Sequence, residues 1–224
     1  MAKNNNSEAL MLKGIDIYEG ISDEEIVCIA KNSHDKKVSK KSLIYSPYED
    51  NTNIYVLKKG EVHLYHYTNE KRVVFDILTP GAVFGCFDPK EKRHTHFAEC
   101  TRDAFLCVTP VREFLLIVEK KPEMMLRFMQ KMATRLKEYE LKLEVSTGTA
   151  ADKIIYEISR LKDKRSRNFF GKFFDIPLRV THEELSLLTG LNRVTITRTL
   201  KQLKKEKRLK VDEKTGGIQV LSGV

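Results

Sequence analysis

The spacing of apolar positions changes near Pro110, which separates a strand-like part of the chain from a helical part. Before this proline, short β-branched and aromatic runs alternate with turn residues such as Gly60, and many short strands at regular spacing predict a sandwich or jelly roll. Ser22, followed three residues later by Glu25, is a capping-box pattern that predicts a short helix before the strands. The expected strands cover residues 43–45, 54–57, 62–67, 73–78, 83–87, 97–100 and 105–108.

After Pro110 the period of apolar positions becomes helical, with a short helix over residues 112–118 and a longer one that ends near Val145. An apolar stripe at alternating spacings of four and three follows the longer helix: Met125, Met129, Met132, Leu136, Tyr139 and Leu143. Such an a/d stripe fits either a helix that packs on its own β domain or the seam of a dimer. Of these two alternatives, we expect the dimer. The expected strands and helices together give the fold class α+β.

Two short helices joined by a tight turn are expected near the C-terminus. Thr181 and Glu184 form a second capping box, and the helix that they start ends at Gly190. Asn192 caps a second helix over residues 193–207, whose apolar residues share one face while its Arg and Thr residues lie on the others. This pattern is typical of a helix-turn-helix, whose second helix enters the DNA major groove. An ordinary helical hairpin with a basic face is the alternative.

Turn residues mark the boundaries of this C-terminal part. Residues 146–149, Ser-Thr-Gly-Thr, interrupt the helical pattern and are interpreted as a hinge, because glycine disfavours helix and Thr149 can cap the next helix. Strand-like runs at 209–211 and 218–221 predict a β-hairpin wing. The expected domains are a β-roll sensor domain with its short helix, a dimerisation helix and a winged helix-turn-helix, over residues 1–110, 111–146 and 147–224.

Positive charge is concentrated in the last third of the chain. The 224 residues include 40 Lys or Arg and 31 Asp or Glu; residues 149–224 hold 17 and 9 of these, which leaves 23 and 22 for residues 1–148. Such asymmetry suggests a neutral domain joined to one that binds a polyanion, here double-stranded DNA. A solvated basic surface would account for the charge equally well, but not for the caps and the turn.

Several protein classes are disfavoured by the sequence. No apolar run reaches about 18 residues, and the polar residues 1–7 contain no signal core, so neither a membrane span nor a cleaved signal is expected. Cys28, Cys86, Cys100 and Cys107 show no CxxC spacing, which fits a reducing cytoplasm. The chain has no P-loop, GxSxG or HExxH motif, so we do not expect an enzyme. A cupin-like metal enzyme on the jelly roll is the remote alternative.

Four segments of the chain, at residues 54–62, 78–85, 181–185 and 190–203, resemble the Crp/Fnr family of bacterial transcription regulators. The resemblance spans nearly the whole chain and includes both the β segments and the helix-turn-helix. It implies a cyclic-nucleotide-binding-type β-roll, a long dimerisation helix and a winged helix-turn-helix. It also implies a homodimer that binds palindromic promoter DNA and is controlled through the β-roll. Activation would need contact with RNA polymerase, whereas repression would need only occupancy of the DNA site; activation is the expectation and repression the alternative.

The resemblance also implies roles for residues of the second helix. Arg193 and Arg198 are expected to read bases, and Val194 replaces the Glu that the catabolite activator type carries between Arg and Thr. Arg-Val-Thr is similar to the nitrogen-control regulators of cyanobacteria, which favour a GTA…TAC palindrome, so we expect GTA-like half-sites. The expected DNA-binding residues are Thr181, Asn192, Arg193, Val194, Thr195, Thr197, Arg198 and Lys201.

The effector pocket departs from the cyclic-AMP-binding pattern. In those members a Gly-Glu-Leu segment holds the ribose, and an Arg-Ser pair holds the phosphate. Here Cys86 replaces the carboxylate, and a neutral thiol cannot accept two ribose hydroxyl bonds as a carboxylate does, so cyclic AMP is not expected. The candidate pocket residues are Gly85, Cys86, Phe87, Arg93, His94, Thr95 and Tyr139.

Other effectors stay open at this point. Cys86, His94 and His96 occupy the region where carbon-monoxide-sensing members carry haem ligands, and Cys thiolate and imidazole are suitable for iron. The same residues with Cys100 are a weaker zinc candidate, because their spacing is not diagnostic. Only Cys28 precedes the strands, so an N-terminal iron–sulfur cluster is excluded. An unknown small metabolite and an effector-independent regulator that needs no cofactor are the remaining alternatives.

Overall fold

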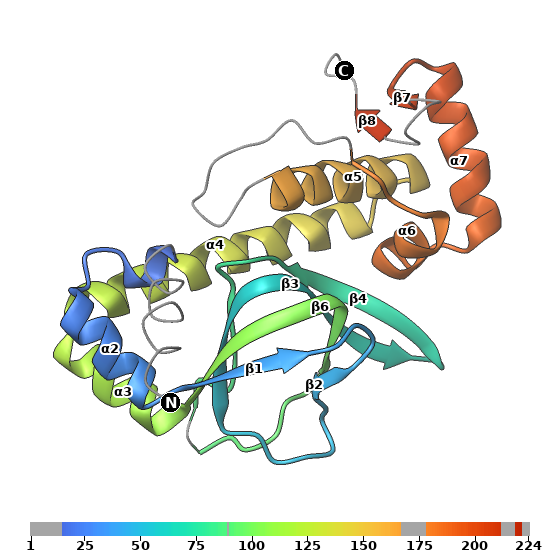
Figure 1. Cartoon of the computed structure of the whole chain (residues 1–224). Helices are drawn as coiled ribbons and strands as arrows, with labels where there is room; N and C mark the ends of the chain where they lie inside the picture. Colours follow the sequence, from blue (N-terminus) through green and yellow to red (C-terminus); the bar gives the residue numbers. More distant parts are fainter. Residues whose placement is uncertain (1–14, 89, 167–177, 212–217, 221–224) are drawn as a thin grey trace. The chain divides into compact units, whose positions relative to one another are not determined.

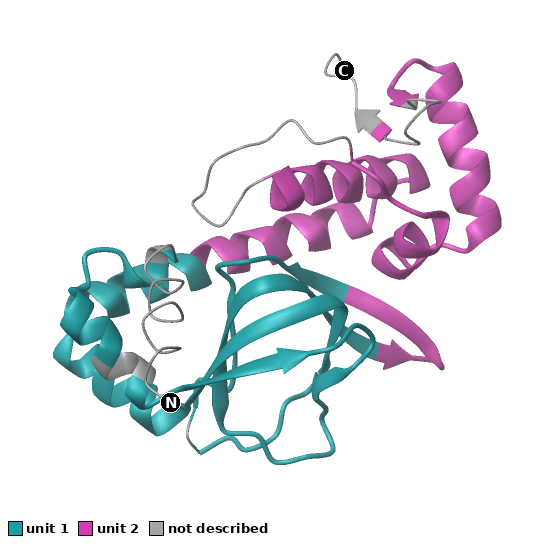
Figure 2. Ribbon diagram, in the orientation of Figure 1, with its two compact units in different colours: residues 1–66, 75–132, 169–171 teal, residues 67–74, 133–168, 172–224 magenta. Residues whose placement is uncertain are grey.

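The computed structural model describes residues 15–88, 90–166, 178–211 and 218–220. These residues form two compact units (Figure 2): unit 1 comprises those up to His66 together with residues 75–132, and unit 2 comprises residues 67–74 together with those from Ala133 onward. The division falls inside the long helix and inside one hairpin of the sheet.

After two short N-terminal helical segments, β1 to β6 form the first half of the chain, and most of the helices follow them (Figure 1). This segregation of strands and helices confirms the α+β class. Helix α4 (Pro122–Ser146) and the hairpin of β3 (Asn53–Thr68) and β4 (Lys71–Leu78) are shared between the units. The other elements of unit 1 are η1 (Asp16–Tyr18), α2 (Asp23–Lys31), β1 (His34–Val38), β2 (Leu43–Tyr45), β5 (Val83–Gly85), β6 (Phe97–Pro110) and α3 (Val111–Lys120). Those of unit 2 are α5 (Ala150–Ser166), α6 (His182–Thr189), α7 (Arg193–Lys205), β7 (Leu209–Val211) and β8 (Ile218–Val220).

The sheet has the strand order β1-β6-β3-β4, with β2 paired to β6 and β5 paired to β3. Strand β6 pairs antiparallel with β1, β2 and β3, so it ties the sheet together. Buried apolar side chains from several strands of the sheet form one contiguous core. Removing these side chains from water favours folding. Members of this core include Tyr45, Tyr55, Leu57, Val62, Leu64, Phe84 and Leu106.

Two pairs of expected strands are each one longer strand. Residues 54–57 and 62–67 belong to β3, which passes through Gly60 with a shift of register instead of turning there. Gly60 has φ +100°, and a Cβ at this position would lie 2.5 Å from the carbonyl oxygen of Asp103, so only glycine allows this bulge. In the same way β6 joins the expected strands 97–100 and 105–108.

A second, helical core completes unit 1. The capping box of α2 forms as expected: Ser22 Oγ accepts from Glu25 N at 3.3 Å, and Glu25 Oε2 accepts from Ser22 N at 3.0 Å. Phe114 and Val118 of α3 pack with Met124 of α4 in one buried cluster. The first turns of α4 are therefore fixed to unit 1 by apolar contacts.

Unit 2 packs α5 against α6 and α7. Its core residues Ile154, Ile158, Leu185, Ile196 and Leu203 are each at most 1% exposed. The expected wing is present as β7 paired antiparallel with β8, although its turn at 212–217 lies outside the described residues. Among the described helices, none combines the length and the hydropathy that a membrane crossing requires.

The start of α5 carries the cap expected at the hinge. Asp152 Oδ2 accepts from Thr149 N at 3.0 Å and from Thr149 Oγ1 at 2.6 Å. These bonds to its charged form hold the pKa of Asp152 below its ordinary value. Thr149 thus starts α5 as the sequence predicts.

Candidate DNA-binding surface and sensor residues

The turn between α6 and α7 is built from the residues that the sequence singled out. Thr181 Oγ1 accepts from Glu184 N at 3.0 Å and so caps α6. Gly190 ends α6 in the left-handed region at φ +71°, and its N–H donates to Ser186 O at 2.9 Å. Asn192 Oδ1 then accepts from Thr195 N at 2.8 Å and caps α7. Both caps and the turn confirm the helix-turn-helix.

Helix α7 buries one face and exposes the other. Ile196, Thr199 and Leu203 lie in the core of unit 2, which fixes the rotation of the helix about its axis. Val194 is 79% exposed, although it is apolar. The helical period places this side chain on the same side as two exposed cations, Arg198 and Lys201.

Arg193 lies in the first turn of α7 and is available for a ligand. Its guanidinium pairs with Glu183 at 3.1 Å, but both side chains are about two-thirds exposed, at 65% and 68%. Exposed pairs of this kind contribute about 0–1 kcal/mol, so DNA can replace the carboxylate at little cost. Glu183 thus holds the guanidinium near the start of α7 without burying it.

Thr197 makes contacts inside unit 2. Its Oγ1 donates to the carbonyl oxygen of Arg193 at 2.9 Å and lies 3.1 Å from His182 Nδ1. The hydroxyl thus links α6 to α7, a contact that the sequence pattern alone did not suggest. The remaining chemistry of this surface consists of cations, an exposed apolar side chain and helix-terminal N–H groups, and this set suits DNA bases and phosphates.

The apolar stripe of α4 is exposed over its central and C-terminal turns. Met129, Leu136 and Leu143, seven residues apart, are 59%, 59% and 74% exposed. Met125 differs, because it packs against the helical core of unit 1. Leu126 adds to the exposed stripe at 56%. Large apolar side chains at a heptad repeat that the described part of the chain leaves exposed are typical of a helix–helix interface.

The first candidate sensor segment, residues 85–87, is held by contacts within unit 1. Gly85 has φ +113°, and a Cβ there would lie 2.4 Å from Asn53 O, so close backbone packing requires this glycine. Cys86 Sγ donates to the carbonyl oxygens of Asp88 and Glu91, both at 2.9 Å. Phe87 packs against the helical core, with its ring centroid 4.9 Å from that of Phe128.

The second candidate segment divides between surface and interior. Arg93 is 70% exposed and pairs with Asp50 at 3.2 Å, and Thr95 is exposed. His94 turns inward: it is 9% exposed and its ring stacks on Tyr45 at a centroid distance of 3.9 Å. Its Nε2 is buried, and no described residue forms a hydrogen bond with it. Tyr139 lies on α4, half-buried, in the part assigned to unit 2.

The contacts of Cys86 do not fit the role of a haem ligand. Burial raises the pKa of the Cys86 thiol, and both of its contacts are with carbonyl oxygens, which require a proton on sulfur. Iron takes the thiolate. His96 Nε2 is 2.8 Å from the Tyr45 hydroxyl. Cys86 therefore belongs to the loop structure of unit 1.

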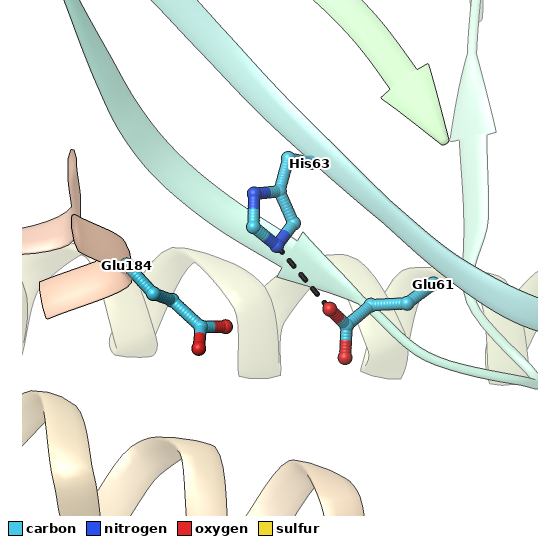
Figure 3. A group of neighbouring side chains, drawn as sticks. All are labelled: Glu61, His63 and Glu184. Atoms are coloured by element: carbon cyan, nitrogen blue, oxygen red, sulfur yellow. Dashed lines mark ion pairs between the residues drawn. The ribbon is translucent and has the colours of Figure 1, made fainter. Parts of the chain in front are cut away.

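A further His–carboxylate contact lies on β3. Glu61 and His63 are both buried, and their Oε1 and Nε2 atoms are 3.3 Å apart (Figure 3). Thr101 Oγ1 also donates to Glu61 Oε1, at 2.9 Å. Glu184, which the figure also labels, belongs to unit 2, where its carboxylate pairs with Arg165. Two ligand groups from one strand are too few for a metal centre, so we assign Glu61 and His63 to the structure of β3.

His94 makes the stability of unit 1 depend on pH. Burial lowers its pKa below the ordinary 6.5, so the folded state favours the neutral ring and the unfolded chain binds the proton more readily. Stability from this residue is complete above pH 6.5 and falls as the pH drops below that value. We expect His94→Phe to reduce the loss of melting temperature between pH 7 and pH 5. The exposed His34→Gln should leave that loss unchanged, and an equal loss in wild type and His94→Phe would contradict the assignment.

Comparison with family models gives two matches, a cyclic nucleotide-binding domain over residues 35–121 and a Crp-like helix-turn-helix domain over residues 152–222. They lie in the order that the sequence resemblance implies. The chain belongs to the Crp/Fnr family. Crp/Fnr proteins are transcription regulators rather than enzymes, and this chain is therefore a regulator with a DNA-binding helix-turn-helix.

Individual Crp/Fnr relatives are distant. The Cyclic AMP receptor protein of Thermus thermophilus is 24% identical over 201 residues, which cover 87% of this chain and 88% of that protein. FixK2 of Bradyrhizobium japonicum has a TM-score of 0.67 at 18% identity, over 85% of this chain and 93% of its own. CLP of Xanthomonas campestris, a c-di-GMP-responsive regulator, has a TM-score of 0.70 at 17% identity, over 91% and 100%. The structures support the fold and say nothing about this chain's effector.

Proposed function

We propose that this Crp/Fnr regulator acts in the cytoplasm as a homodimer that binds two-fold symmetric promoter DNA. The observation that carries the proposal is the exposed face of α7, which presents Arg193, Val194 and Arg198 beside a buried face that fixes the helix. A dimer places two such helices about one DNA turn (34–36 Å) apart, in successive major grooves. Once the dimer occupies its DNA site, contact with RNA polymerase would activate transcription.

The stripe of α4 supports the dimer. Pairing of two α4 helices would remove Met129, Leu136 and Leu143 of each chain from water. Fully burying a side chain of this size contributes up to about 1.5–3 kcal/mol, and this gain from each chain opposes the entropic cost of association. Met132 and Tyr139 lie at the intervening positions of the same repeat. A two-fold dimer binds a palindrome, because the symmetry of the protein and that of its site must match.

The chemistry of α7 supports GTA-like half-sites. Arg193 and Arg198 can each donate two hydrogen bonds to guanine O6 and N7. Val194 has no acceptor for the cytosine amino group but can pack on the methyl group of thymine. Lys201, Thr195 and the capped helix ends would hold phosphates and set the register. Thr181 and Asn192 contribute through those caps.

Control through the β-roll is the allosteric part of the proposal. A small-molecule effector, or the effector-free conformation of the β-roll itself, would favour one position of α4. The position of α4 would in turn set the arrangement of the recognition helices. The Cys86 thiol in place of a ribose carboxylate and the exposure of Arg93 disfavour cyclic AMP.

Equilibrium binding to two DNA duplexes tests the proposal. One duplex carries an inverted GTA…TAC repeat and the other a scrambled sequence of the same composition. At physiological salt the repeat should bind about 10³-fold more tightly or better, and the affinity for both should fall as salt rises. Equal affinities for the two duplexes would contradict the proposed GTA-like half-sites.

Val194 sets one base preference, and its substitution should change that preference. In Val194→Glu a carboxylate can accept from cytosine N4, so the preference at the contacted base should move from thymine to cytosine by about tenfold or more. Val194→Ala keeps a methyl contact and serves as the matched control, with thymine still preferred. Competition between labelled duplexes that differ at this one base measures the ratio. An unchanged preference in Val194→Glu would show that residue 194 does not face the bases.

A further inference from the structure

Unit 2 contains a buried carboxylate that is shared by two cations. Glu157 of α5 is 2% exposed. Its Oε1 lies 2.9 Å from Lys142 Nζ, and its Oε2 accepts from Arg160 Nε at 2.9 Å. Lys142 belongs to α4 and Arg160 to α5, so the carboxylate ties these two helices together on either side of the expected hinge.

Lys142 also reaches a third element. Its Nζ donates to the carbonyl oxygen of Val74 at 3.0 Å. Val74 is the fourth residue of β4 after the turn of the β3–β4 hairpin. Residues 67–74 belong to unit 2, although the rest of both strands belongs to unit 1 (Figure 2). One ammonium group therefore joins the long helix, the first helix of the DNA-binding region and a hairpin that continues into the sensor sheet.

This arrangement tolerates little displacement. If the hairpin moves by about an ångström, the bond from Lys142 to Val74 lengthens beyond its normal range, where hydrogen bonds weaken steeply. The flexible lysine stem can follow the carbonyl only by moving away from Glu157. Removal of one partner leaves the others as buried charges without full compensation, which is costly. A network of this kind favours one relative position of its three elements over others.

We propose that Lys142 and Glu157 are positioning residues that couple the β3–β4 hairpin to DNA binding. Strands β3 and β4 run through the β-roll, so a change there reaches Val74 along the chain and alters the junction of α4 with α5. That junction sets the spacing of the two recognition helices in a dimer. The inference rests on the proposed function and names the side chains that carry its regulation.

The test distinguishes an effect on the spacing of the two recognition helices from an effect on the DNA contacts of a single recognition helix. Affinities are measured for a duplex with the full inverted repeat and for one with a single half-site. Lys142→Met removes the ammonium and keeps the aliphatic stem, and we expect it to lower affinity for the full repeat at least tenfold while half-site affinity stays within twofold. Lys142→Arg keeps a positive donor and should restore most of the loss.

Glu138→Gln is the matched control. It removes the Lys164–Glu138 ion pair, which joins the same two helices at 2.9 Å but is more exposed, and we expect both of its affinities to match wild type. Hydrogen exchange gives a second measurement: binding of the full repeat should slow exchange at residues 67–74 in wild type and not in Lys142→Met.

Three results would overturn the inference: full-repeat affinity unchanged in Lys142→Met, an equal fall for both duplexes, or unchanged protection of the hairpin. Failure of the proposed function is a different result, because wild type itself would then show no preference for the repeat.

Discussion

Arg193→Ala should abolish specific DNA binding while the dimer persists. Arg193 starts α7 with its side chain 65% exposed, and its only partner among the ion pairs of the described residues is the equally exposed Glu183. A bidentate contact with guanine contributes about 1–3 kcal/mol of discrimination, and a dimer makes two such contacts. The expected loss is therefore about 2–6 kcal/mol, or about 30- to 10⁴-fold in affinity for the repeat.

Two measurements accompany that variant. Titration of the full repeat gives the specific affinity, and titration of scrambled DNA gives the non-specific affinity. Only the specific affinity should fall. Sedimentation or light scattering should still show the wild-type mass. Arg102→Ala removes an exposed arginine from β6 of unit 1 and should leave both affinities near wild type. A monomeric Arg193→Ala variant, or one with wild-type specificity, would contradict the assignment of α7 as the recognition helix.

Lysine substitutions in the stripe of α4 should dissociate the dimer. Leu136 and Leu143 are 59% and 74% exposed in the single chain and would be covered by the partner helix. Each substitution removes a buried leucine from both helices, about 1.5–3 kcal/mol per side chain, and adds a charge that must be desolvated. Leu136→Lys combined with Leu143→Lys should therefore give monomers at micromolar concentration.

The loss of the dimer should appear in DNA binding as well. The monomeric variant should bind the full repeat no more tightly than a single half-site, because the second binding event is no longer intramolecular. Leu116→Lys is the matched control, since this leucine of α3 is also half exposed, at 51%, but lies outside the stripe. A dimeric double variant would show that the subunits meet through another surface.

The helix-turn-helix was predictable almost to the residue, because its signals are local. Thr181, Gly190 and Asn192 occupy the cap and turn positions that the sequence assigns to them, and the apolar face of α7 is buried as its period requires. Capping bonds connect residues three apart, so their pattern is visible without knowledge of the fold.

The sheet was predictable in class but not in its strand ends. The sequence predicts a turn at Gly60, because glycine marks both turns and bulges in a sequence, and only pairing with β6 distinguishes them. Strand β1 has mostly polar, exposed side chains and therefore gave no alternating signal. Its place comes from hydrogen bonds to β6, such as the pairing of His34 with Val108.

The sensor residues and the buried network required the structure. Arg93 and His94 are neighbours in sequence, yet one pairs with Asp50 at the surface and the other stacks inside the roll. The i,i+3 spacing of Glu157 and Arg160 was visible in the sequence, but charged residues on helices usually face solvent. Lys142 lies on a different helix, so its place in the network depends on tertiary packing.

Selection from a pool of duplexes with a randomised central region tests the central claim most directly, because it assumes no operator. The account predicts enrichment of inverted repeats with GTA-like half-sites, about one DNA turn apart from centre to centre, bound by two copies of the chain. Enrichment of single or directly repeated sites would contradict the symmetric dimer. No enrichment over the starting pool would contradict sequence-specific regulation itself.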